Sequence, residues 1–575
     1  MTKRKIAFLT GVLLSLSVIL GCKNAAGDSG NGGNSGTEID ESLNKHSEWL
    51  MLMYMDGDNN LNDPIYLDLN EAEHGLSKLG EEDSVTIVVL WDGWDFASGN
   101  DSENPETSVF GEIPESYGKI NTAPTRLLEL GPDNDPLYAD NGAWYYKGVH
   151  LSSKTKDLTN AVSWIQNGEV NMASETTLEN FLKWAKANYS AEKVILQFSN
   201  HGGGPRSAMG TKKNYSRRSM CWDETSGENG FLKTSDVSKA LKNAGYGPSN
   251  KVSLIMEDVC LGGSLEESYE LRNYSDYYVG SPNNVPGNGF DYISFVSSLK
   301  KGASLEQVGC NLIKTYGEAY EYSESKWNEY IEKNPEVAAK GDMWISLSNP
   351  NVRTLTFVDL SKVAAVKSSV SELAGLIFND TNGDERIIVY NNKYYFLNSD
   401  GKYFDNNGNQ LPEGETPNPI YRKYAIQRWT AYYGDPIYYD GTFGCLKDLG
   451  AMCAFMRSYY SESSWLALNE KTNAVTAALA DAVVASWRDG YKAPTYYKNK
   501  ADNVYYDAFS CTTPVTLDNA PDLGAGLTIN CSCWVPYEKN GQTYKTYGFE
   551  NWYKNELAFG KDCTNWTSLI ELWWN

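Results

Sequence analysis

Two residues that could act as a nucleophile and a base each follow a predicted buried strand. His201 comes after the apolar run at 194–198, and Cys260 comes after the apolar run at 252–256. Because sites in parallel sheets gather at the carboxyl ends of the strands, the two side chains could meet in one crevice. A thiol that attacks a carbonyl group needs a base that forms or holds the thiolate, and histidine is the usual one.

The same segments offer the backbone groups that this chemistry needs. The N–H groups of Gly202 and Cys260 are natural donors to an oxyanion, and glycines beside the histidine permit close approach of the backbone to a substrate. Taken singly, a cysteine at a strand end is usually a small core side chain, and a histidine before glycines can simply lie in a turn. The chain has only four histidines, so their joint occurrence favours a His-Cys dyad.

The elements that must position these residues repeat in a strand–helix rhythm. Continuous apolar runs at 49–55 and 85–91, each closed by turn residues, predict strands buried on both faces, with a helix at 64–79 between them. Further helices are expected at 177–189, 235–244, 264–272 and 474–487, and further strands at 194–198, 252–256 and 277–280, whereas 354–359 is expected to be a strand or a domain junction. This order of elements predicts an α/β fold with a parallel sheet.

Composition excludes several classes of protein. With 50 basic and 74 acidic residues the formal net charge is −24, which repels phosphate backbones, so no nucleic acid is expected as a partner. The 39 tyrosines and 17 tryptophans are too many for a disordered protein, and four histidines argue against a multi-histidine zinc or haem enzyme. Apart from Cys22 there are nine cysteines, an odd number, so outside the cytoplasm at least one thiol is unpaired unless a bond joins two chains.

The first 22 residues are predicted to be a targeting segment. Basic residues at 3–5 precede an apolar run that is short for a membrane span. The run ends at Ile-Leu-Gly-Cys22, which resembles the lipobox of bacterial lipoproteins and implies lipidation of Cys22; an ordinary cleaved signal is the alternative. Residues 23–48, rich in Gly, Asn and Ser, predict a flexible linker. We therefore expect a lipid-anchored protein of the bacterial cell envelope or surface, outside the cytoplasm, with the membrane as a partner.

Several blocks of the sequence resemble, in order, the clostripain-like cysteine peptidases, which have the caspase-like fold. These blocks are WLMLMYMDGDNNL at 49–61, SNHGGG at 199–204, the segment from Cys221, EDVCLGG from Glu257 through the PGNGF turn, and GLTINCSCWVP at 526–536. The resemblance covers about 49–575. It implies a caspase-like, mostly parallel sheet flanked by helices over 49–350, followed by a mixed α/β C-terminal domain over 351–575, with Tyr-rich β-hairpins inserted near 380–420.

This resemblance implies a cysteine endopeptidase that acts on proteins or peptides and needs no cofactor for its chemistry. Cys260 would be the nucleophile and His201 the general base and acid. The family prefers a basic residue before the scissile bond, held by acidic side chains, and Asp258 matches one such acid. Asn288 stands where a second acid is expected, which removes one charge that would hold Arg or Lys. The alternative for Asp258 is a structural acid that caps the following turn.

Self-processing and calcium dependence are also implied. Related peptidases cleave themselves after a basic residue between the His and Cys strands, and the basic cluster at 211–219 offers Lys213, Arg217 and Arg218 as candidate sites; an uncut, solvated loop is the alternative. The family is often calcium-dependent, so calcium is a candidate cofactor, although no ligands can be named. The acidic run at 380–384 is expected to be a solvated turn rather than a calcium loop.

Two other classes of protein share some of these features. A His-Gly-Gly-Gly motif also occurs in α/β-hydrolase esterases, but the sequence has no Gly-x-Ser-x-Gly motif, since the nearest match at 262–266 lacks the last glycine. A catalytically inactive surface lipoprotein that binds proteins or glycans is the second alternative. Retention of both His201 and Cys260 argues against a loss of activity.

Overall fold

The computed structural model describes the chain in stretches between Lys45 and Trp574. These are residues 45–59, 61–93, 125–134, 151–166, 168–205, 219–223, 230–287, 289–318, 354–391, 393–405, 407–415, 418–433, 446–460, 465–490, 493–499, 504–507, 514–515, 526–531, 537–539, 542–544 and 551–574. The predicted signal segment 1–22, with its lipidation site Cys22, and nearly all of the linker 23–48 lie outside the described residues.

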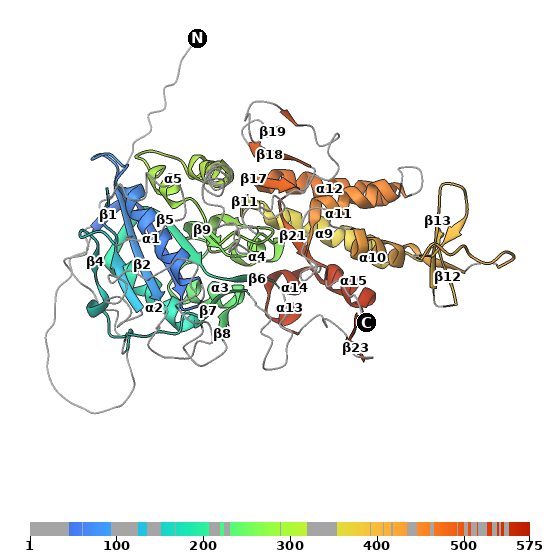
Figure 1. Ribbon diagram of the computed structural model, residues 1–575, viewed down its shortest axis with the longest axis horizontal. Coiled ribbons are helices and arrows are strands. Elements are labelled where there is room, and N and C mark those ends of the chain that lie inside the picture. Colours follow the sequence, from blue (N-terminus) through green and yellow to red (C-terminus); the bar gives the residue numbers. More distant parts are fainter. Residues whose placement is uncertain are drawn as a thin grey trace, which may run out of the picture. The chain divides into compact units, whose positions relative to one another are not determined.

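A twelve-stranded sheet is the central element of the described residues (Figure 1). Its strands, in spatial order, are β20 (Pro514–Val515), β19 (Val504–Asp507), β18 (Ala493–Asn499), β17 (Val483–Gly490), β11 (Thr354–Asp359), β10 (Ser275–Gly280), β9 (Val252–Asp258), β5 (Tyr189–Ser199), β1 (Lys45–Gly57), β2 (Val85–Gly93), β3 (Thr125–Glu129) and β4 (Lys156–Asp157). The five strands β2, β1, β5, β9 and β10 are parallel, and antiparallel strands continue the sheet on both sides. The predicted α/β fold with parallel strands at its centre is confirmed.

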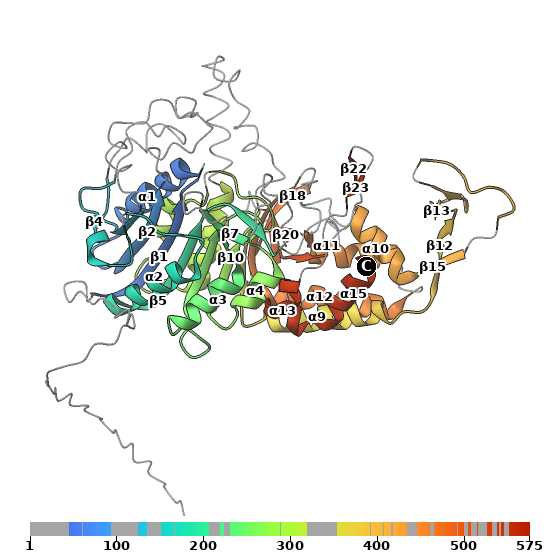
Figure 2. The same cartoon turned by 90° about the horizontal axis from the view of Figure 1, so that it is seen from below.

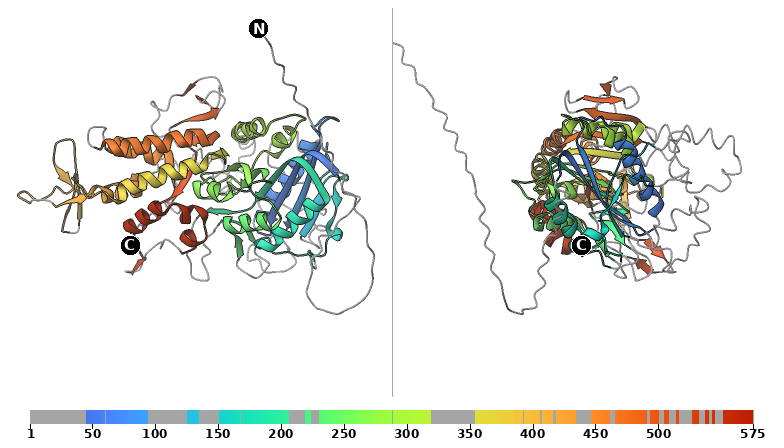
Figure 3. Two further views of the ribbon diagram at one scale, coloured as in Figure 1. Left: turned by 180° about the vertical axis from the view of Figure 1, so that it is seen from behind. Right: turned by 90° about the vertical axis from the view of Figure 1, so that its left-hand side faces the viewer.

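Helices cover both faces of the parallel strands because β1 is apolar on both of its faces (Figure 3). The odd-numbered residues Trp49 to Met55 pack into one core with residues of α1 and α5, and the even-numbered residues Leu50 to Tyr54 pack into the other core with residues of α2, α3 and α4. Side chains of a strand alternate between the two faces, so a continuous apolar run requires cover on each side.

The helices of the described residues are α1 (Asn62–Leu76), α2 (Glu175–Asn188), α3 (Thr234–Asn243), α4 (Leu265–Leu271), α5 (Tyr292–Ser297), α9 (Val363–Phe378), α10 (Arg422–Tyr433), α11 (Leu449–Tyr459), α12 (Leu466–Ala482), α13 (Asn551–Asn555), α14 (Ala558–Asp562) and α15 (Thr564–Trp574). The helices α1 to α4 begin and end within three residues of the predicted boundaries. The side chain of Ser174 accepts a hydrogen bond from the backbone N–H of Thr176 and caps α2. Within the stretches that the structure describes, no helix combines the length and the apolar run that crossing a membrane requires.

The chain after residue 351 continues the same sheet. β11 pairs with β10 and β17, so antiparallel strands from the C-terminal part follow directly on the parallel strands. The predicted helix over 474–487 is wrong in its last turn, because α12 ends at Ala482 and residues 483–490 form β17. The β-branched Val483 pairs with Val358 of β11 instead, so strand pairing overrides the helical period. The domain boundary at 350 stays a prediction.

The region near 380–420 forms a separate four-stranded sheet in the order β14 (Tyr403–Phe404), β13 (Lys393–Leu397), β12 (Gly383–Tyr390) and β15 (Asn418–Tyr421). Residues 381–383 of the acidic run at its start are exposed, as expected of a solvated turn, but the two acids of the run are buried, which was not expected. Asp380 is buried and pairs with Arg422 at 2.6 Å, and Asp384 is buried and pairs with Arg386 at 3.1 Å. The two arginines neutralise these carboxylates, so this run is not available to a metal ion.

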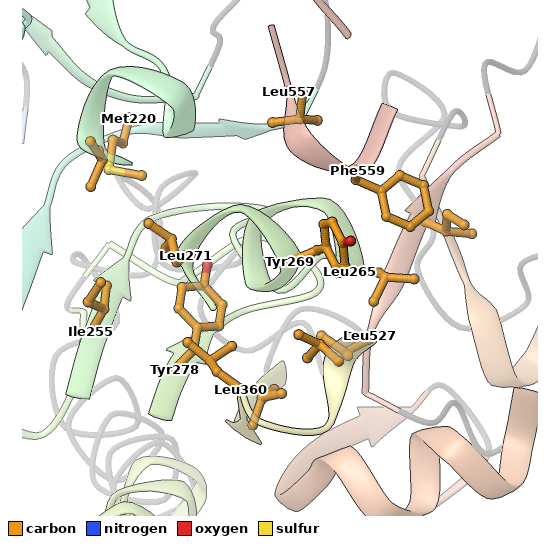
Figure 4. Close-up of a cluster of buried hydrophobic side chains, with 14 of the residues drawn as sticks. Met220, Ile255, Leu265, Tyr269, Leu271, Tyr278, Leu360, Leu527, Leu557 and Phe559 are labelled. Carbon is orange, nitrogen blue, oxygen red and sulfur yellow. The ribbon is translucent and has the colours of Figure 1, made fainter. Parts of the chain in front are cut away.

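The C-terminal segments pack around α4, the helix that follows Cys260. Figure 4 shows Leu527, Leu557 and Phe559 near Leu265 and Tyr269 of α4. In the C-terminal part of the chain, α12 and α15 each contact α9 (Figure 2). Short strand pairs complete the fold: β16 (Leu446–Asp448) with β21 (Thr528–Asn530), β22 (Tyr537–Lys539) with β23 (Gln542–Tyr544), and the sheet of β6 (Gly202–Gly204), β7 (Ser219–Asp223) and β8 (Gly230–Leu232).

Candidate active site

The strands that carry His201 and Cys260 are direct neighbours and end at the same level. β5 and β9 pair in parallel, with Ser199 opposite Asp258, so His201 and Cys260 each lie two residues beyond a matched pair. Beyond the strands the backbones stay together, because the N–H of Asn200 donates to the carbonyl of Asp258 at 3.4 Å. The register of β5 and β9 therefore brings the two segments together at the carboxyl end of the sheet, as the sequence predicts.

Gly202 lies against the peptide of Cys260. A Cβ atom added to Gly202 would stand 2.1 Å from the carbonyl oxygen of Cys260 and 2.7 Å from its backbone nitrogen. No larger residue fits at this position unless the backbone moves. The histidine segment and the cysteine segment therefore touch through their backbones, with the residue after His201 packed on the predicted nucleophile.

The turn after Cys260 has an unusual backbone. Leu261 has a φ of 66°, in the left-handed region that residues with a side chain seldom adopt. Its N–H donates to the carbonyl of Asn283 at 2.9 Å, which helps to hold this conformation. Such residues persist where the surrounding structure imposes them, commonly at functional sites. The turn fixes Cys260 between the end of β9 and the start of α4.

Asn200 connects the histidine to two further segments. Its side-chain amide donates to the carbonyl of Asp56 at 2.7 Å, and its side-chain oxygen accepts from the N–H of Trp222 at 3.1 Å. The ring of Trp222 lies 6.2 Å from the ring of His201, measured between centroids. The carbonyl of Trp222 in turn accepts from the side chain of Asn59 at 2.9 Å. The position of His201 thus depends on the end of β1 and on β7.

Cys260 is more exposed than most of the other described cysteines. Cys260 is partly exposed, and its Sγ lies 3.8 Å from the carbonyl oxygen of Val285. Cys221, Cys453 and Cys563 are buried, and burial raises the pKa of Cys221 well above its usual range, that of Cys453 to about 12 and that of Cys563 to about 11. A thiol with a raised pKa provides little thiolate, so these three are unsuited to nucleophilic attack.

Asp258 lies in a buried acidic pair. Its Oδ2 accepts hydrogen bonds from the N–H of Phe290 and from the hydroxyl of Tyr292, both at 2.9 Å. A Cβ atom on Gly289 would stand 2.5 Å from this oxygen and 3.3 Å from Oδ2 of Asp68. Burial raises the pKa of Asp258 to about 7, and burial together with the charge of Asp258 raises the pKa of Asp68 well above its usual range. Asp68 on α1 is a second acid that the sequence analysis did not single out.

The model of the clostripain family matches residues 53–487, which is more than half of the chain. This chain belongs to the clostripain family. The resemblance seen in the sequence is thereby confirmed. Clostripain from Hathewaya histolytica is 23% identical over 355 residues, which cover 60% of this chain and 59% of clostripain, so the chain spans less than two thirds of that relative's length.

Solved structures of clostripain-family (C11) proteases are also similar to this chain. A secreted C11 cysteine protease from Bacteroides thetaiotaomicron, in complex with an irreversible peptide inhibitor, has a TM-score of 0.46 and 16% identity, with 91% of this chain and 99% of that chain covered. An inactive zymogen C11 protease from Parabacteroides distasonis has a TM-score of 0.43 and 14% identity, with 84% and 92% covered. The family assignment rests on the family model.

In this member of the clostripain family, a C-terminal residue contacts both the segment after His201 and the helix after Cys260. The side chain of Asn530 donates to the carbonyl of Pro205, four residues after His201, at 2.7 Å, and its N–H donates to the carboxylate of Glu266 in α4 at 2.8 Å. Burial raises the pKa of Glu266 to about 7. The block at 526–536 was noted in the sequence only as a family match, and nothing local in it reveals these partners.

Several predicted site residues cannot be placed. Asn288 and the candidate cleavage sites Lys213, Arg217 and Arg218 lie outside the described residues. The segments on either side of the basic cluster are described: β6 ends at Gly204, β7 begins at Ser219, and the two strands pair antiparallel. The roles of these four residues stay predictions.

A second group of acids could hold a metal ion. Asp58, Asp92, Glu169 and Asp223 each have one carboxylate oxygen within 4.8 Å of the others. Oxygen ligands of this kind suit calcium, the cofactor that the family resemblance implied without ligands. These residues come from four separate parts of the sequence, which is why no local motif marked them.

Proposed function

We propose that this chain is a cysteine endopeptidase in which Cys260 is the nucleophile and His201 is the general base and acid. The observation that carries the proposal is the packing of Gly202 on the peptide of Cys260, at the matched ends of β5 and β9. Cys260 is also partly exposed, whereas Cys221 and Cys453 are buried with raised pKa values. The assigned family supports the same reaction.

In the acylation step, His201 takes the thiol proton of Cys260, and the Sγ thiolate attacks the carbonyl carbon of the scissile peptide bond. The N–H groups of Gly202 and Cys260 donate to the oxyanion that forms. His201 then protonates the leaving nitrogen as the carbon–nitrogen bond breaks, which leaves a thioester on Cys260. In deacylation His201 takes a proton from water, and the water oxygen attacks the thioester carbon; the carbon–sulfur bond then breaks, the carboxylic acid product leaves, and the proton returns to the sulfur. His201 accepts and returns each transferred proton, so these steps need no catalytic group besides Cys260, His201 and the two backbone N–H groups.

The proposed specificity is for Arg or Lys before the scissile bond, with Asp258 and Asp68 as the acids that hold its charge. Both carboxylates are buried, and the groups that perturb their pKa values are acids and hydrogen-bond donors rather than lysines or arginines of the described residues. Two buried carboxylates without a basic partner favour a cation from outside the chain. Asp68 would supply the charge that Asn288 lacks.

Self-processing after Lys213, Arg217 or Arg218 is part of the proposal. β6 and β7 flank the segment 206–218 and pair with each other, so a cut within it would leave both ends in one sheet. β5 and β9, on the two sides of the cut, are also neighbours. The two resulting chains would therefore stay associated.

We also propose that the protein is held outside the cytoplasm of a bacterium by a lipid on Cys22. The support is the lipobox-like end of the segment 1–22. A protein or peptide substrate in that compartment would meet the carboxyl end of the sheet.

Labelling with a thiol-reactive peptide ketone that ends in Arg tests the dyad. We expect wild type to bind one label and to hydrolyse Arg-containing peptides, and Cys260→Ala to do neither while still folding. His201→Ala should lose nearly as much activity, because members of a catalytic unit act together. Cys310→Ala is the matched control, since Cys310 is the other described cysteine that is partly exposed. Turnover by Cys260→Ala at the wild-type rate would contradict the mechanism.

Substitution of the acidic pair tests the specificity. Asp258→Asn and Asp68→Asn should each lower cleavage after Arg far more than cleavage after a neutral residue, because a desolvated charge loses its partner. Asp276→Asn, at an exposed position of β10, is the control. Asn288→Asp should raise the preference for basic residues. Equal losses on basic and neutral peptides would show that the acids are only structural.

A denaturing gel with terminal sequencing tests self-processing. Wild type should give two fragments that meet within 211–219, whereas Cys260→Ala should stay a single chain. An active enzyme that is never cut would reject self-processing and leave the peptidase proposal in place.

A further inference from the structure

Behind the turn at 260–264, one tyrosine hydroxyl lies between two oxygen atoms that ordinarily only accept hydrogen bonds. The Oη atom of Tyr278 stands 2.5 Å from Oε2 of Glu257 and 2.6 Å from the carbonyl oxygen of Gly262. Glu257 lies in β9, three residues before Cys260, and Gly262 follows Cys260 by two residues. Tyr278 lies in β10, the strand that pairs with β9. Its hydroxyl therefore joins the strand before the predicted nucleophile to the turn after it.

The number of protons available at this point decides the protonation state of Glu257. A tyrosine hydroxyl has one proton to donate, whereas a carbonyl oxygen and an ionised carboxylate can only accept. If Glu257 were ionised, Tyr278 would donate to it, and the oxygens of Tyr278 and Gly262 would stand 2.6 Å apart with no hydrogen between them. Both contacts are hydrogen bonds only when a protonated Glu257 donates to Tyr278 and Tyr278 donates to Gly262. The two distances therefore indicate a neutral carboxyl group at Glu257.

The surroundings of Glu257 also favour its neutral form. Glu257 and Tyr278 have no exposed surface, and Oε1 of Glu257 has no hydrogen-bond partner among the described residues. Figure 4 shows Tyr278 among apolar side chains, including those of Leu271 and Leu360. In such surroundings an ionised carboxylate with an unpaired oxygen costs far more free energy than a neutral carboxyl group. Burial accordingly raises the pKa of Glu257 to about 8.

The titratable groups that face Glu257 include no lysine or arginine of the described residues. They are Tyr278 of β10, Glu267 of α4 and Cys221 of β7, and burial, together with the charge of Glu257, raises the pKa of each of them. The hydroxyl of Ser264 donates to the carboxylate of Glu267 at 2.9 Å. A proton on Glu257 therefore avoids a buried charge that no basic partner offsets.

The carbonyl of Gly262 belongs to the turn that presents Cys260. It accepts the N–H of Ser264, within the same turn, at 2.8 Å, whereas the hydroxyl of Tyr278 ties it to the sheet. Leu261, between Cys260 and Gly262, has its φ of 66° in the left-handed region, which persists only where the surroundings impose it. Loss of the bond from Tyr278 would leave this carbonyl with its local partner and free the turn to relax.

We propose that Glu257 is a positioning residue: its protonated carboxyl group donates to Tyr278, which in turn donates to the Gly262 carbonyl and so holds the turn that presents Cys260. This role rests on the proposed peptidase function, because the reaction it serves is that of Cys260. When the carboxyl proton leaves to solvent, Tyr278 donates to the carboxylate instead, and the Gly262 carbonyl loses this donor.

The neutral form of Glu257 holds the turn, so the turn should loosen as the pH rises. Because the pKa of Glu257 is about 8, the two hydrogen bonds are both present at pH 7 and one is lost as the pH rises through about 8. Glu257→Gln separates this effect from any titration of His201, since His201 is present in both proteins. The amide N–H of the glutamine donates to Tyr278 at every pH.

The rate at which the peptide ketone labels Cys260 in the full chain, measured from pH 6 to pH 10, tests this role. The ratio of the wild-type rate to the Glu257→Gln rate should be near one at pH 7 and should fall several-fold above pH 8. Tyr278→Phe, which lacks the donor, should be labelled roughly tenfold more slowly or worse at pH 7.

Tyr189→Phe is the matched control, because the hydroxyl of Tyr189 also donates to a buried carboxylate, that of Glu129, at 2.9 Å. Tyr189 is the first residue of β5, at the opposite end of the sheet from the site, so this variant should be labelled like wild type at every pH. Identical pH profiles of wild type and Glu257→Gln would overturn the proposal. Labelling of Tyr278→Phe at the wild-type rate would overturn it too, as would a rate of Glu257→Gln at pH 7 as low as that of Tyr278→Phe.

Hydrogen exchange in wild type gives a test that does not depend on how any variant folds. The N–H groups of Leu261 and Gly263 donate to the carbonyls of Asn283 and Ser281 at 2.9 and 2.7 Å. After correction for the intrinsic effect of pH on exchange, their protection should fall several-fold between pH 7 and pH 9. Equal protection at the two pH values would overturn the proposal. If protection falls but wild type is labelled at no pH, the peptidase proposal fails and the control of the turn by Glu257 stands.

Discussion

At the residue scale, Gly202 has the least room of any position in the candidate site. Gly202→Ala would place a Cβ atom 2.1 Å from the carbonyl oxygen of Cys260, so the histidine and cysteine segments must separate. Because a displacement of about 1 Å can cost on the order of a hundredfold in rate, we expect kcat/KM to fall by at least that factor. Peptide hydrolysis and ketone labelling measure the loss.

The control for this substitution is Gly247→Ala. Nothing lies within 4 Å of a Cβ atom at Gly247, so this variant should keep its activity. Wild-type activity of Gly202→Ala would show that the close packing of the two segments is not needed for catalysis.

Asp258 gives the site a pH dependence with a defined sign. Its pKa is raised to about 7 by burial, so its carboxyl group is neutral below pH 7 and charged above it. A cationic side chain needs the charged form, so the ratio of kcat/KM for Arg peptides to that for neutral peptides should fall as the pH drops through about 7. Taking the ratio cancels any pH dependence of the bond-breaking step that is the same for both substrates. In Asp258→Asn this ratio should be low and should not change with pH. If the ratio in this variant still falls with pH as in wild type, Asp258 is not the titrating group.

At the scale of elements, Asn530 of β21 contacts both the segment after His201 and the helix after Cys260. Asn530→Ala removes the donor to the buried carbonyl of Pro205, and an unsatisfied buried carbonyl costs about 1–3 kcal/mol. Because Pro205 lies four residues after His201 in the same segment, we also expect kcat/KM to fall by roughly tenfold or more. Chemical unfolding and peptide hydrolysis measure the two effects.

Asn565→Ala is the matched control for Asn530→Ala. Asn565 also donates to a backbone carbonyl, that of Ser371, but at an exposed position where water can replace it. We expect a change within about 0.5 kcal/mol and normal activity. Similar behaviour of the two variants would show that the contact with Pro205 has no special role.

At the scale of the whole molecule, the C-terminal part completes the structure around the site. β17 pairs with β11, and one hydrophobic core contains residues from Leu50 to Trp573. A chain that ends at residue 350 would expose many apolar side chains, and the burial of each contributes about 1.5–3 kcal/mol. Their summed contribution exceeds the roughly 5–15 kcal/mol that stabilises a typical domain. We expect this chain not to fold into a form that the ketone labels, as judged by circular dichroism and labelling.

Deletion of residues 392–415 is the control for this truncation. The deletion removes β13, which pairs with β12 and with β14, and it also removes β14. The pairing of β12 with β15 remains. This chain should fold and be labelled at Cys260. A folded, labelled chain ending at 350 would instead establish the predicted domain boundary.

The sequence by itself determined the parallel strands, the helices between them and the placement of His201 and Cys260. These are local properties: apolar runs define strands, a 3.6-residue period defines helices, and a residue just after a strand lies at the end of the sheet. The resemblance to the clostripain family could be read for the same reason, since its blocks are contiguous.

Only the tertiary structure decided which distant residues meet. Asp68 approaches Asp258 across a helix–sheet contact, and Asn530 reaches Pro205 from more than 300 residues away. The four acids Asp58, Asp92, Glu169 and Asp223 come from the residue after β1, from β2, from the segment before α2 and from β7. The end of α12 was also decided by a partner, because β17, which follows it directly, pairs with β11 from Val483 to Arg488. Contacts of this kind depend on packing between elements, and no pattern within a short window of sequence specifies them.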